Sequence, residues 1–530
     1  MQIAVTIVAF ALAFSVCGLA IAAETASPSG PGLRYYYPVA PADPPQVFDV
    51  DVCVYGDTPG GIAAAIQARR LGRTSALFCF GRHIGGMTAG GLSATDVGNA
   101  KAIGGMAREF YDRVGMMRGF RPSKARETFL AMLKEAGVPV HLEHRLAKVI
   151  KDGPRITEIA FENGNRARAR IFVDATYEGD LLAGAGVSYH VGRESNDMYQ
   201  ETLNGKQFRN THNFVVPVDP YKVEGDPSSG LLWGISDEAP GKAGEGDRHV
   251  QAYNFRMFLS SAEDRIPFPR PPGYDPARYA LLVRYLARHP HVPFQLREGD
   301  SNNTGGFSTD YIGGSDAWPE ADYATRERIF QDHVNYQQGL MFFAANDPSV
   351  PADLRQKVSR FGLAAGEFTA TGGWPPQLYV REGRRMVSDY VMTEHNCLGK
   401  VVAEDGIGLA SYNMDSHNCR RIVIDGKVRN EGDVQVKCPQ PYPISYRSIV
   451  PREKQCTNLL VPVCLSSTHI AYGSIRMEPV FMILGQSAAT AGVLALESNV
   501  PVQRVDYAKL KQRLVAMGQI LQWNPSPLSP

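Results

Sequence analysis

The first strongly patterned segment of the chain is an apolar run, a turn, a helix and a second apolar run. Residues 50–55 and 74–80 are short apolar runs with the length of buried strands, and residues 62–71 have helical character up to Gly72. Residues 56–61 form the turn between the first strand and the helix. Units of this kind build parallel sheets, which bind ligands at the carboxyl ends of their strands.

The alternation of helical and strand-like patterns continues beyond this unit. Residues 126–136 have the spacing of an amphipathic helix. Residues 141–150 and 156–161 are strand-like runs around a Lys-Asp-Gly turn, and residues 168–174 form another strand. We therefore predict an α/β domain in which helices cover a largely parallel sheet.

The middle of the chain has a different character. Residues 195–375 are polar, irregular and rich in proline and aromatic residues, and we interpret them as an inserted α+β substrate domain. The regular pattern then returns: residues 458–464 predict a strand, residues 466–473 a loop, and residues 476–496 contain a helix. The predicted fold class is α/β, with a Rossmann-like domain assembled from N- and C-terminal segments around the insertion.

The N-terminus has the pattern of a secretory signal. Residues 3–16 are apolar, and Cys17 and then Ala20-Ile21-Ala22, which has the A-x-A form, follow them. We predict a signal peptide over residues 1–23, a secreted or periplasmic protein, and no stable membrane insertion after cleavage. A membrane anchor is the alternative, because no charge flanks the run. Residues 24–46, rich in Pro, Ser, Gly and Ala, are predicted to be a linker.

Composition and charge narrow the class of partner. The 530 residues include 44% hydrophobic and 21% charged residues, which is the composition of an ordinary globular protein. The formal net charge is +1, so no polyanion-binding surface is indicated and we expect no nucleic-acid partner. A small-molecule substrate is the expected partner instead.

Cysteine usage leaves two interpretations open. Cys53 and Cys79 lie in apolar runs and are expected to be buried. The remaining cysteines after Cys17 are Cys397, Cys419, Cys438, Cys456 and Cys464. The first four of these cluster in sequence, and an exported protein could pair some of them. A zinc site is the alternative, but the chain has no C-x-x-C, and no metal is predicted.

The turn at residues 56–61 has the chemistry of a phosphate-binding loop. Gly56 and Gly61 stand at the first and last positions of G-x-G-x-x-G, which supply the sharp turn and the close helix–strand contact. Thr58 replaces the middle glycine. An ordinary strand–helix turn is the alternative. No acid follows about 20 positions later, where Cys79 stands, and Arg82 would suit a 2′-phosphate, so NADP is a rival ligand.

The next segment favours FAD over NADP. The stretch Gly81-Arg82-His83-Ile84-Gly85-Gly86-Met87 resembles the arginine-then-double-glycine segment of glutathione-reductase-like flavoproteins. In that superfamily the segment runs along the ribityl and pyrophosphate groups of FAD. A flexible surface loop is the alternative interpretation.

Over residues 48–500 the chain resembles the bacterial secreted FAD-dependent oxidoreductase family, some members of which carry a xanthan-lyase-like label. The motifs are the turn at 55–61, the segment 81–87, Asp174-Ala175-Thr176, residues 380–386 and residues 473–479. Thr58 fits this family, whereas Cys79 departs from its usual glutamate. The resemblance implies cofactor-binding roles for Gly56, Thr58, Pro59, Gly60, Gly61, Arg82, Gly85, Gly86, Met87, Ala175, Thr176, Arg476, Gly485 and Gln486.

The pattern along the chain also predicts how the domains are divided. The boundaries are a signal peptide 1–23, a linker 24–46, an FAD-binding domain 47–194 and 376–500, a substrate domain 195–375, and a C-terminal helix and tail 501–530. In the superfamily the N-terminus of the last long helix lies at the flavin and stabilises negative charge on the ring.

Flavin chemistry usually requires a base and a group that anchors the substrate. His469, ahead of the last long helix, is the first candidate base, and His417 beside Asp415 is the second. Arg447 is a candidate for binding an anionic substrate. For each of them a structural hydrogen bond is the alternative. His83, beside the glycines, leaves open a covalent link to the flavin.

Three tryptophans in the middle region suggest a type of substrate. Trp233, Trp318 and Trp374 could be platforms for sugar rings, or core residues. We predict an exported FAD-dependent oxidoreductase that removes hydride from a small organic substrate, with a carbohydrate-like molecule as one candidate. The electron acceptor is oxygen or a respiratory carrier. The alternatives are a flavin-containing lyase or isomerase without net redox, and a non-catalytic exported binding protein.

Overall fold

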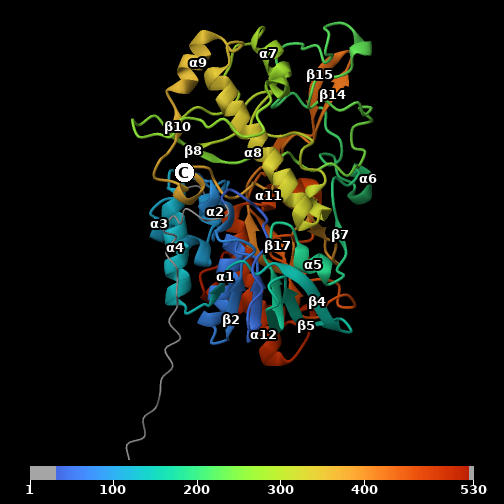
Figure 1. The fold of residues 1–530 in the computed structure, drawn as a ribbon. Coiled ribbons are helices and arrows are strands. Elements are labelled where there is room, and N and C mark those ends of the chain that lie inside the picture. Colours follow the sequence, from blue (N-terminus) through green and yellow to red (C-terminus); the bar gives the residue numbers. More distant parts are fainter. Residues whose placement is uncertain (1–31, 524–530) are drawn as a thin grey trace, which may run out of the picture.

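The structure is a computed structural model that describes residues 32–523. The predicted signal peptide and the first part of the predicted linker lie outside these residues. Figure 1 shows two regions: a lower one built on the main sheet with α1 (Pro59–Arg70) and α12 (Glu478–Ser498), and an upper one around α8 (Tyr323–Asn346).

The main sheet has seven strands, in the order β3-β2-β1-β6-β5-β4, with β18 also beside β6. The strands are β1 (Val47–Tyr55), β2 (Ser75–Phe78), β3 (Val140–His141), β4 (Leu146–Asp152), β5 (Arg155–Phe161), β6 (Arg166–Asp174) and β18 (Leu459–Leu460). β1 pairs in parallel with β2 and β6, and β18 pairs in parallel with β6. β4 and β5 are antiparallel. Strand β18 comes from the far end of the chain, so the α/β domain assembled from both chain segments is confirmed.

Helices α1 and α12 pack against each other beside this sheet. The ends of α1 follow its sequence: Thr58 caps the N-terminus and Pro59 takes the first position, where its missing N–H costs nothing. The other helices of this region are α3 (Gly105–Val114), α4 (Pro122–Glu135), α5 (Asp180–Gly184) and α13 (Tyr507–Ala516). α12 is apolar and buried from residue 478 to residue 496.

α12 is the one helix of the described chain that is long and apolar enough to span a membrane. Its most apolar 18-residue stretch is fully buried inside the protein. A core helix passes the same test of length and composition, so we interpret α12 as the core of this domain.

The upper region has its own apolar core. Its elements are α7 (Ala280–Leu286), α8, α9 (Ala352–Ser359), a sheet of β8 (Met257–Ser260), β9 (Gly299–Ser301) and β10 (Gly362–Leu363), and the hairpin β14 (Arg420–Ile424)–β15 (Lys427–Glu431). Val428 of the hairpin packs with Tyr279, Tyr336 and Phe343 of the insertion. This hairpin belongs by sequence to the segment 376–500 that we assigned to the FAD-binding domain, but it packs on the insertion (Figure 1).

The chain also forms several short helices and strands. They are α2 (Gly86–Gly90), α6 (Asn196–Tyr199), α10 (Glu394–Cys397), α11 (His469–Ile475), β7 (Tyr189–His190), β11 (Arg385–Met386), β12 (Gly406–Ala410), β13 (Met414–Ser416), β16 (Val434–Val436) and β17 (Tyr442–Ser445). The loop predicted at 466–473 is wrong, because α11 begins at His469. Its N-cap is Thr468, whose Oγ1 accepts from the Ala471 amide at 3.4 Å.

The predicted linker contributes to the core. Tyr35 stacks on Phe80 with ring centroids 4.6 Å apart and meets Trp318 edge-on at 4.7 Å. The Pro- and Gly-rich composition of residues 24–46 did not predict these contacts. They hold the segment from Leu33 to Tyr37 against the carboxyl end of β2.

All seven cysteines of residues 32–523 are buried and free. The sequence left pairing among four of them open, and the structure contains none of these disulfides. Cys397 donates from its Sγ to the Tyr442 hydroxyl at 3.3 Å, and Cys438 lies 3.5 Å from the Ser474 hydroxyl.

Candidate active site

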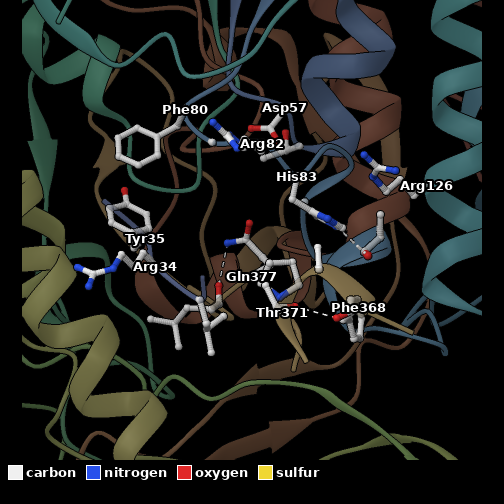
Figure 2. A pocket seen from close by; sticks show the side chains of 18 of the residues that line it. Arg34, Tyr35, Asp57, Phe80, Arg82, His83, Arg126, Phe368, Thr371 and Gln377 are labelled. Atoms are coloured by element: carbon white, nitrogen blue, oxygen red, sulfur yellow. Dashed lines mark hydrogen bonds between the residues drawn. The ribbon is translucent and has the colours of Figure 1, made fainter. Parts of the chain in front are cut away.

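A cavity of about 420 Å³ lies at the carboxyl ends of β1, β2 and β6. Figure 2 shows Asp57, Arg82 and His83 on one side of it and Phe368, Thr371 and Gln377 on the other. Of the predicted cofactor residues, those that line it are Gly56, Thr58, Arg82, Gly86 and Thr176. Parallel sheets bind ligands at this edge, so the cavity lies where the sequence predicted it.

The turn before α1 requires both of its terminal glycines. Gly56 has φ +109°, and a Cβ there would lie 2.5 Å from the carbonyl carbon of Ala175. A Cβ on Gly61 would lie 1.9 Å from the Gly56 oxygen. Glycine at these two positions therefore permits the sharp turn and the close approach of α1 to the end of β6.

Thr58 takes the place of the middle glycine and has a structural role. Its Oγ1 donates to the Ala175 carbonyl at 2.7 Å and accepts from the Gly61 amide at 3.3 Å. One side chain therefore caps α1 and ties it to the end of β6. Gly60 faces α12 instead of the cavity, because a Cβ there would lie 2.9 Å from the Phe481 oxygen.

The double glycine begins α2 and meets a tyrosine that the sequence did not single out. A Cβ on Gly86 would lie 2.3 Å from the Tyr177 hydroxyl, and the Met87 amide donates to that hydroxyl at 2.9 Å. Tyr177 in turn donates to Glu478 Oε1 at 2.8 Å, and Thr88 donates to Glu478 Oε2 at 2.9 Å. Glu478, at the start of α12, thereby joins this helix to the glycine-rich segment. Burial raises its pKa to about 7.

Arg82 and His83 have different partners. Arg82 is half exposed and forms an ion pair with Glu143, Nε to Oε1 at 2.9 Å. His83 Nε2 lies 2.9 Å from the Ala89 carbonyl oxygen, and burial lowers the pKa of His83 to about 4. Both side chains line the cavity. His83 is therefore neutral at pH 7.

His469, the first candidate base, is enclosed by protein. Its Nδ1 lies 2.6 Å from Glu382 Oε2, and its Nε2 lies 2.9 Å from Ser416 Oγ. The side chain is only 2% exposed. Because both ring nitrogens have protein partners, His469 orients the start of α11 and is a poor candidate for contact with a substrate.

His417 is more accessible and has one ring nitrogen without a short contact. Its Nδ1 lies 2.7 Å from Asp310 Oδ2, while Nε2 lies 3.7 Å from Asp415 Oδ2, too far for a hydrogen bond. The side chain is 12% exposed. Burial and Arg381 lower the pKa of His417, but Asp310 and Asp415 outweigh them, and the net shift is upward.

Two buried arginines lie beside His417. Arg476 donates from Nη2 to Asp415 Oδ2 at 3.1 Å, and Arg381 Nη2 lies 3.1 Å from Asp310 Oδ1. Their guanidinium carbons lie 5.8 Å and 4.8 Å from the Tyr379 ring centroid. Among the described residues, Nε of each arginine has no hydrogen-bond partner. Buried donors of this kind usually have a water or ligand partner.

This cluster of His417, Arg381, Arg476 and Tyr379, which we call the His417 cluster, adjoins the cavity. Gln377 and Leu378 line the cavity, and Tyr379 is the next residue along the chain. Gln377 also packs closely on the end of α2, because a Cβ on Gly90 would lie 2.4 Å from the Gln377 Cβ. The chain therefore leads directly from the cavity lining into the His417 cluster.

Arg447, the predicted anion-binding residue, lies elsewhere. Its Nε forms an ion pair with Asp405 Oδ2 at 3.0 Å, and its side chain is 52% exposed. The guanidinium also lies over the Tyr390 ring, 4.7 Å from the centroid. Arg447 is a surface residue paired with a local carboxylate, and it is not among the residues that line the cavity.

A family model described as FAD dependent oxidoreductase matches residues 51–514, which is most of the chain. The chain belongs to the FAD dependent oxidoreductase family. Its predicted fold, flavin cofactor and enzyme class are confirmed. No curated protein sequence matches this oxidoreductase.

Solved structures add little to the family assignment. THI4 of Thermovibrio ammonificans is 21% identical over 27% of this chain and 64% of that chain, with a TM-score of 0.22. L-amino acid deaminase of Proteus vulgaris is 13% identical over 30% of this chain and 55% of that chain, with a TM-score of 0.24. A third is the 3-ketosteroid-Δ4-(5α)-dehydrogenase of Rhodococcus jostii RHA1, which is 15% identical over 26% of this chain and 50% of that chain, with a TM-score of 0.20. The chain spans less than two thirds of these relatives, and such scores carry no argument about the oxidoreductase's substrate.

The cavity residues of the oxidoreductase fit FAD. Gly56 and Gly61 leave the backbone space that a pyrophosphate needs beside the start of α1, and Thr176 lines the opposite strand end. Arg82 and Gly86 would lie along the rest of the cofactor. When bound, FAD supplies a two-electron acceptor for a hydride.

Gly485 and Gln486 do not reach this cavity, contrary to prediction. A Cβ on Gly485 would lie 2.0 Å from the Gly60 oxygen, so this glycine lets α12 cross α1. Gln486 Oε1 accepts from the Met106 amide at 2.9 Å and from Gln519 Nε2 at 2.8 Å. The small residues of α12 face another helix backbone instead of the flavin.

The structure also places the three tryptophans that the sequence singled out. Trp318 and Trp374 are fully buried, and Trp233 lies 5.4 Å from the Tyr311 ring and 5.7 Å from the Tyr336 ring. Trp318 and Trp374 are core residues, and Trp233 is partly buried against the aromatic core of the insertion. Within residues 32–523 no group of three or more His, Cys, Asp or Glu is placed to hold a metal ion.

Glu478→Gln should change how the stability of the apoprotein depends on pH. The folded-state pKa of Glu478, about 7, lies above the ordinary 4.5. Its protonated form therefore contributes to folding stability below pH 4.5, and this contribution is lost as pH rises through 7. Glutamine cannot ionise, so above pH 7 the variant should be more stable, by on the order of 3 kcal/mol.

Urea denaturation at pH 5 and pH 8.5 measures this difference. Glu263→Gln is the matched control, because Glu263 is exposed, and its effect should stay below about 0.5 kcal/mol at both values. If the free energy of unfolding changed equally between pH 5 and pH 8.5 in wild type and in Glu478→Gln, ionisation of Glu478 would not be the cause of the pH dependence.

Proposed function

We propose that this enzyme removes a hydride from a small organic substrate held at the His417 cluster. The observation that carries the proposal is His417 itself, with Nδ1 fixed by Asp310 and Nε2 without a short contact, beside two buried arginines with unpartnered donors. A neutral imidazole held in this way can take a proton from a substrate hydroxyl or amine as the hydride leaves.

The neighbouring groups have distinct roles in this proposal. Asp310 orients the imidazole and stabilises its protonated form, as a buried carboxylate does in other acid–base pairs. Arg381 and Arg476 bind oxygen atoms of the substrate. Asp415 holds Arg476 at 3.1 Å and lies near His417 Nε2. A carbohydrate-like substrate would offer such oxygens, but it no longer has support from the tryptophans.

Export is part of the same proposal. The pattern of residues 3–22, an apolar run followed by an A-x-A site, supports a secreted or periplasmic enzyme that delivers electrons to oxygen or to a respiratory carrier. N-terminal sequencing of the protein from culture medium and periplasm is the test. A mature chain that begins near Glu24 supports export, and an intact N-terminus in the cytoplasm contradicts it.

A visible spectrum before and after acid precipitation, followed by anaerobic addition of candidate substrates, tests the function. We expect a yellow protein that releases FAD and is bleached by its substrate. Turnover with the flavin oxidised throughout would instead support a lyase or isomerase. Colour retained in the precipitate would indicate a covalent link, with His83 the first residue to change. A protein that binds flavin but turns over no substrate would support a binding protein.

A further inference from the structure

The end of β2 lacks the acid that usually holds the ribose of a dinucleotide. Dinucleotide-binding folds place an Asp or Glu there, about 20 residues after the glycine-rich turn. Here Cys79 occupies the position, and its side chain is fully buried. Burial and the nearby Asp57 raise the pKa of this thiol, so it stays neutral. A neutral thiol is a weak acceptor and cannot bind two hydroxyl groups as a carboxylate can.

Asp57 lies close to this position but comes from another element. It stands between Gly56 and Thr58 in the turn after β1, and it lines the cavity. Figure 2 shows it on the wall that also carries Arg82 and His83. Its carboxylate is near enough to act electrostatically on the Cys79 thiol, and the Gly85 amide fixes its backbone by donating to the Asp57 carbonyl at 3.0 Å.

Within residues 32–523, only its own backbone amide donates to the Asp57 carboxylate. In the part of the chain that the structure describes, it forms no ion pair, and no other residue donates a hydrogen bond to it. Burial raises its pKa to about 7, which is the cost of a buried carboxylate without donors from other residues. A ligand with two adjacent hydroxyl groups would supply the missing donors.

The other carboxylates of the cavity are engaged or lie elsewhere. Asp180 receives hydrogen bonds from Arg326 and Arg384. Glu367 receives them from Arg121 and Ser123. Glu127 is 69% exposed on α4, and Glu178 lies on the β6 side near Arg326. Asp57 alone of these is both unpaired and adjacent to the end of β2.

We propose that Asp57 binds the 2′- and 3′-hydroxyl groups of the adenosine ribose of FAD, in place of an acid at position 79. The ribose-binding group is thereby moved from the end of β2 to the turn after β1. The same arrangement disfavours a 2′-phosphate, because Asp57 would repel it and Glu143 neutralises Arg82.

Ligand competition on the apoprotein tests the proposal without using activity. The probes are ADP and 2′,3′-dideoxy-ADP, each competing with FAD, on wild type and on Asp57→Asn, which keeps the size of the side chain. We expect wild type to prefer ADP by about 10-fold, as hydrogen bonds to a charged acceptor allow. Asp57→Asn should lose most of this preference and bind FAD about 10-fold more weakly.

Cys79→Ser is the matched control, because it alters the usual ribose-binding position itself; its ADP preference should stay within about 2-fold of wild type. Asp57→Asn with an intact ADP preference would overturn the proposal. So would an equal loss of affinity for ADP and dideoxy-ADP, because the loss would then not arise at the ribose hydroxyls. Failure of wild type to bind FAD would instead contradict the flavin assignment.

Discussion

Gly485→Ala should lower the free energy of unfolding by about 3 kcal/mol, the upper end for an overpacked core. The added Cβ would lie 2.0 Å from the Gly60 oxygen and 2.7 Å from its carbonyl carbon. Both atoms belong to the backbone of α1, so no side chain can move aside, and α1 and α12 must separate. Urea denaturation of the apoprotein measures the loss, and FAD binding should weaken with it.

Gly492→Ala is the matched control on the same helix. Its Cβ would lie 3.0 Å from Ile171 Cγ2, which is the end of a side chain that can move. Alanine also gains about 1 kcal/mol in helix propensity over glycine, so the net effect should be within about 1 kcal/mol. Equal losses in the two variants would show that the α1–α12 crossing is not the cause.

His417→Gln should lower kcat by about 10²- to 10⁴-fold, the range for loss of a general base. The flavin spectrum and the dissociation constant for FAD should not change, because His417 lies outside the cavity lining. Asp310 and Asp415 raise the pKa of His417 overall, so activity should rise with pH through a midpoint above the ordinary 6.5. Steady-state kinetics and the pH profile measure both effects.

Two further variants separate this role from others. Arg447→Gln should leave kcat within about 2-fold, because Arg447 is exposed and paired with Asp405. His469→Gln should lower stability, because Glu382 and Ser416 lose a buried partner. If His469→Gln remained stable and lost the pH-dependent activity while His417→Gln kept it, the assignment of the two histidines would be reversed.

The sequence predicted what depends on local patterns. The unit of β1, α1 and β2 follows from two apolar runs and the glycines between them, so its place and its ligand edge were predictable. The α11 helix was missed because it is only seven residues long and contains Gly473 and Ser474, which are typical of a loop. Its cap at Thr468 was the available signal.

The remaining site residues depend on contacts between distant parts of the chain. Asp310 and His417 are 107 residues apart, and Tyr177 and Glu478 are 301 apart, so no spacing rule connects them. Gly485 was predicted to bind the cofactor, and the sequence does not show that it faces the backbone of Gly60 instead. The partner of Arg447, Asp405, is also distant in sequence, so the sequence alone did not reveal this pair.

The position of α12 also determines when the protein can fold during synthesis. This helix is among the last elements made, yet it fills the space beneath α1, which is among the first. Until the ribosome has passed residue 498, the face of α1 that meets α12 is uncovered, and β18 has not joined β6. The core of the cofactor domain therefore cannot be completed before α12 has been made, and until then the nascent chain exposes apolar surface that α12 later covers.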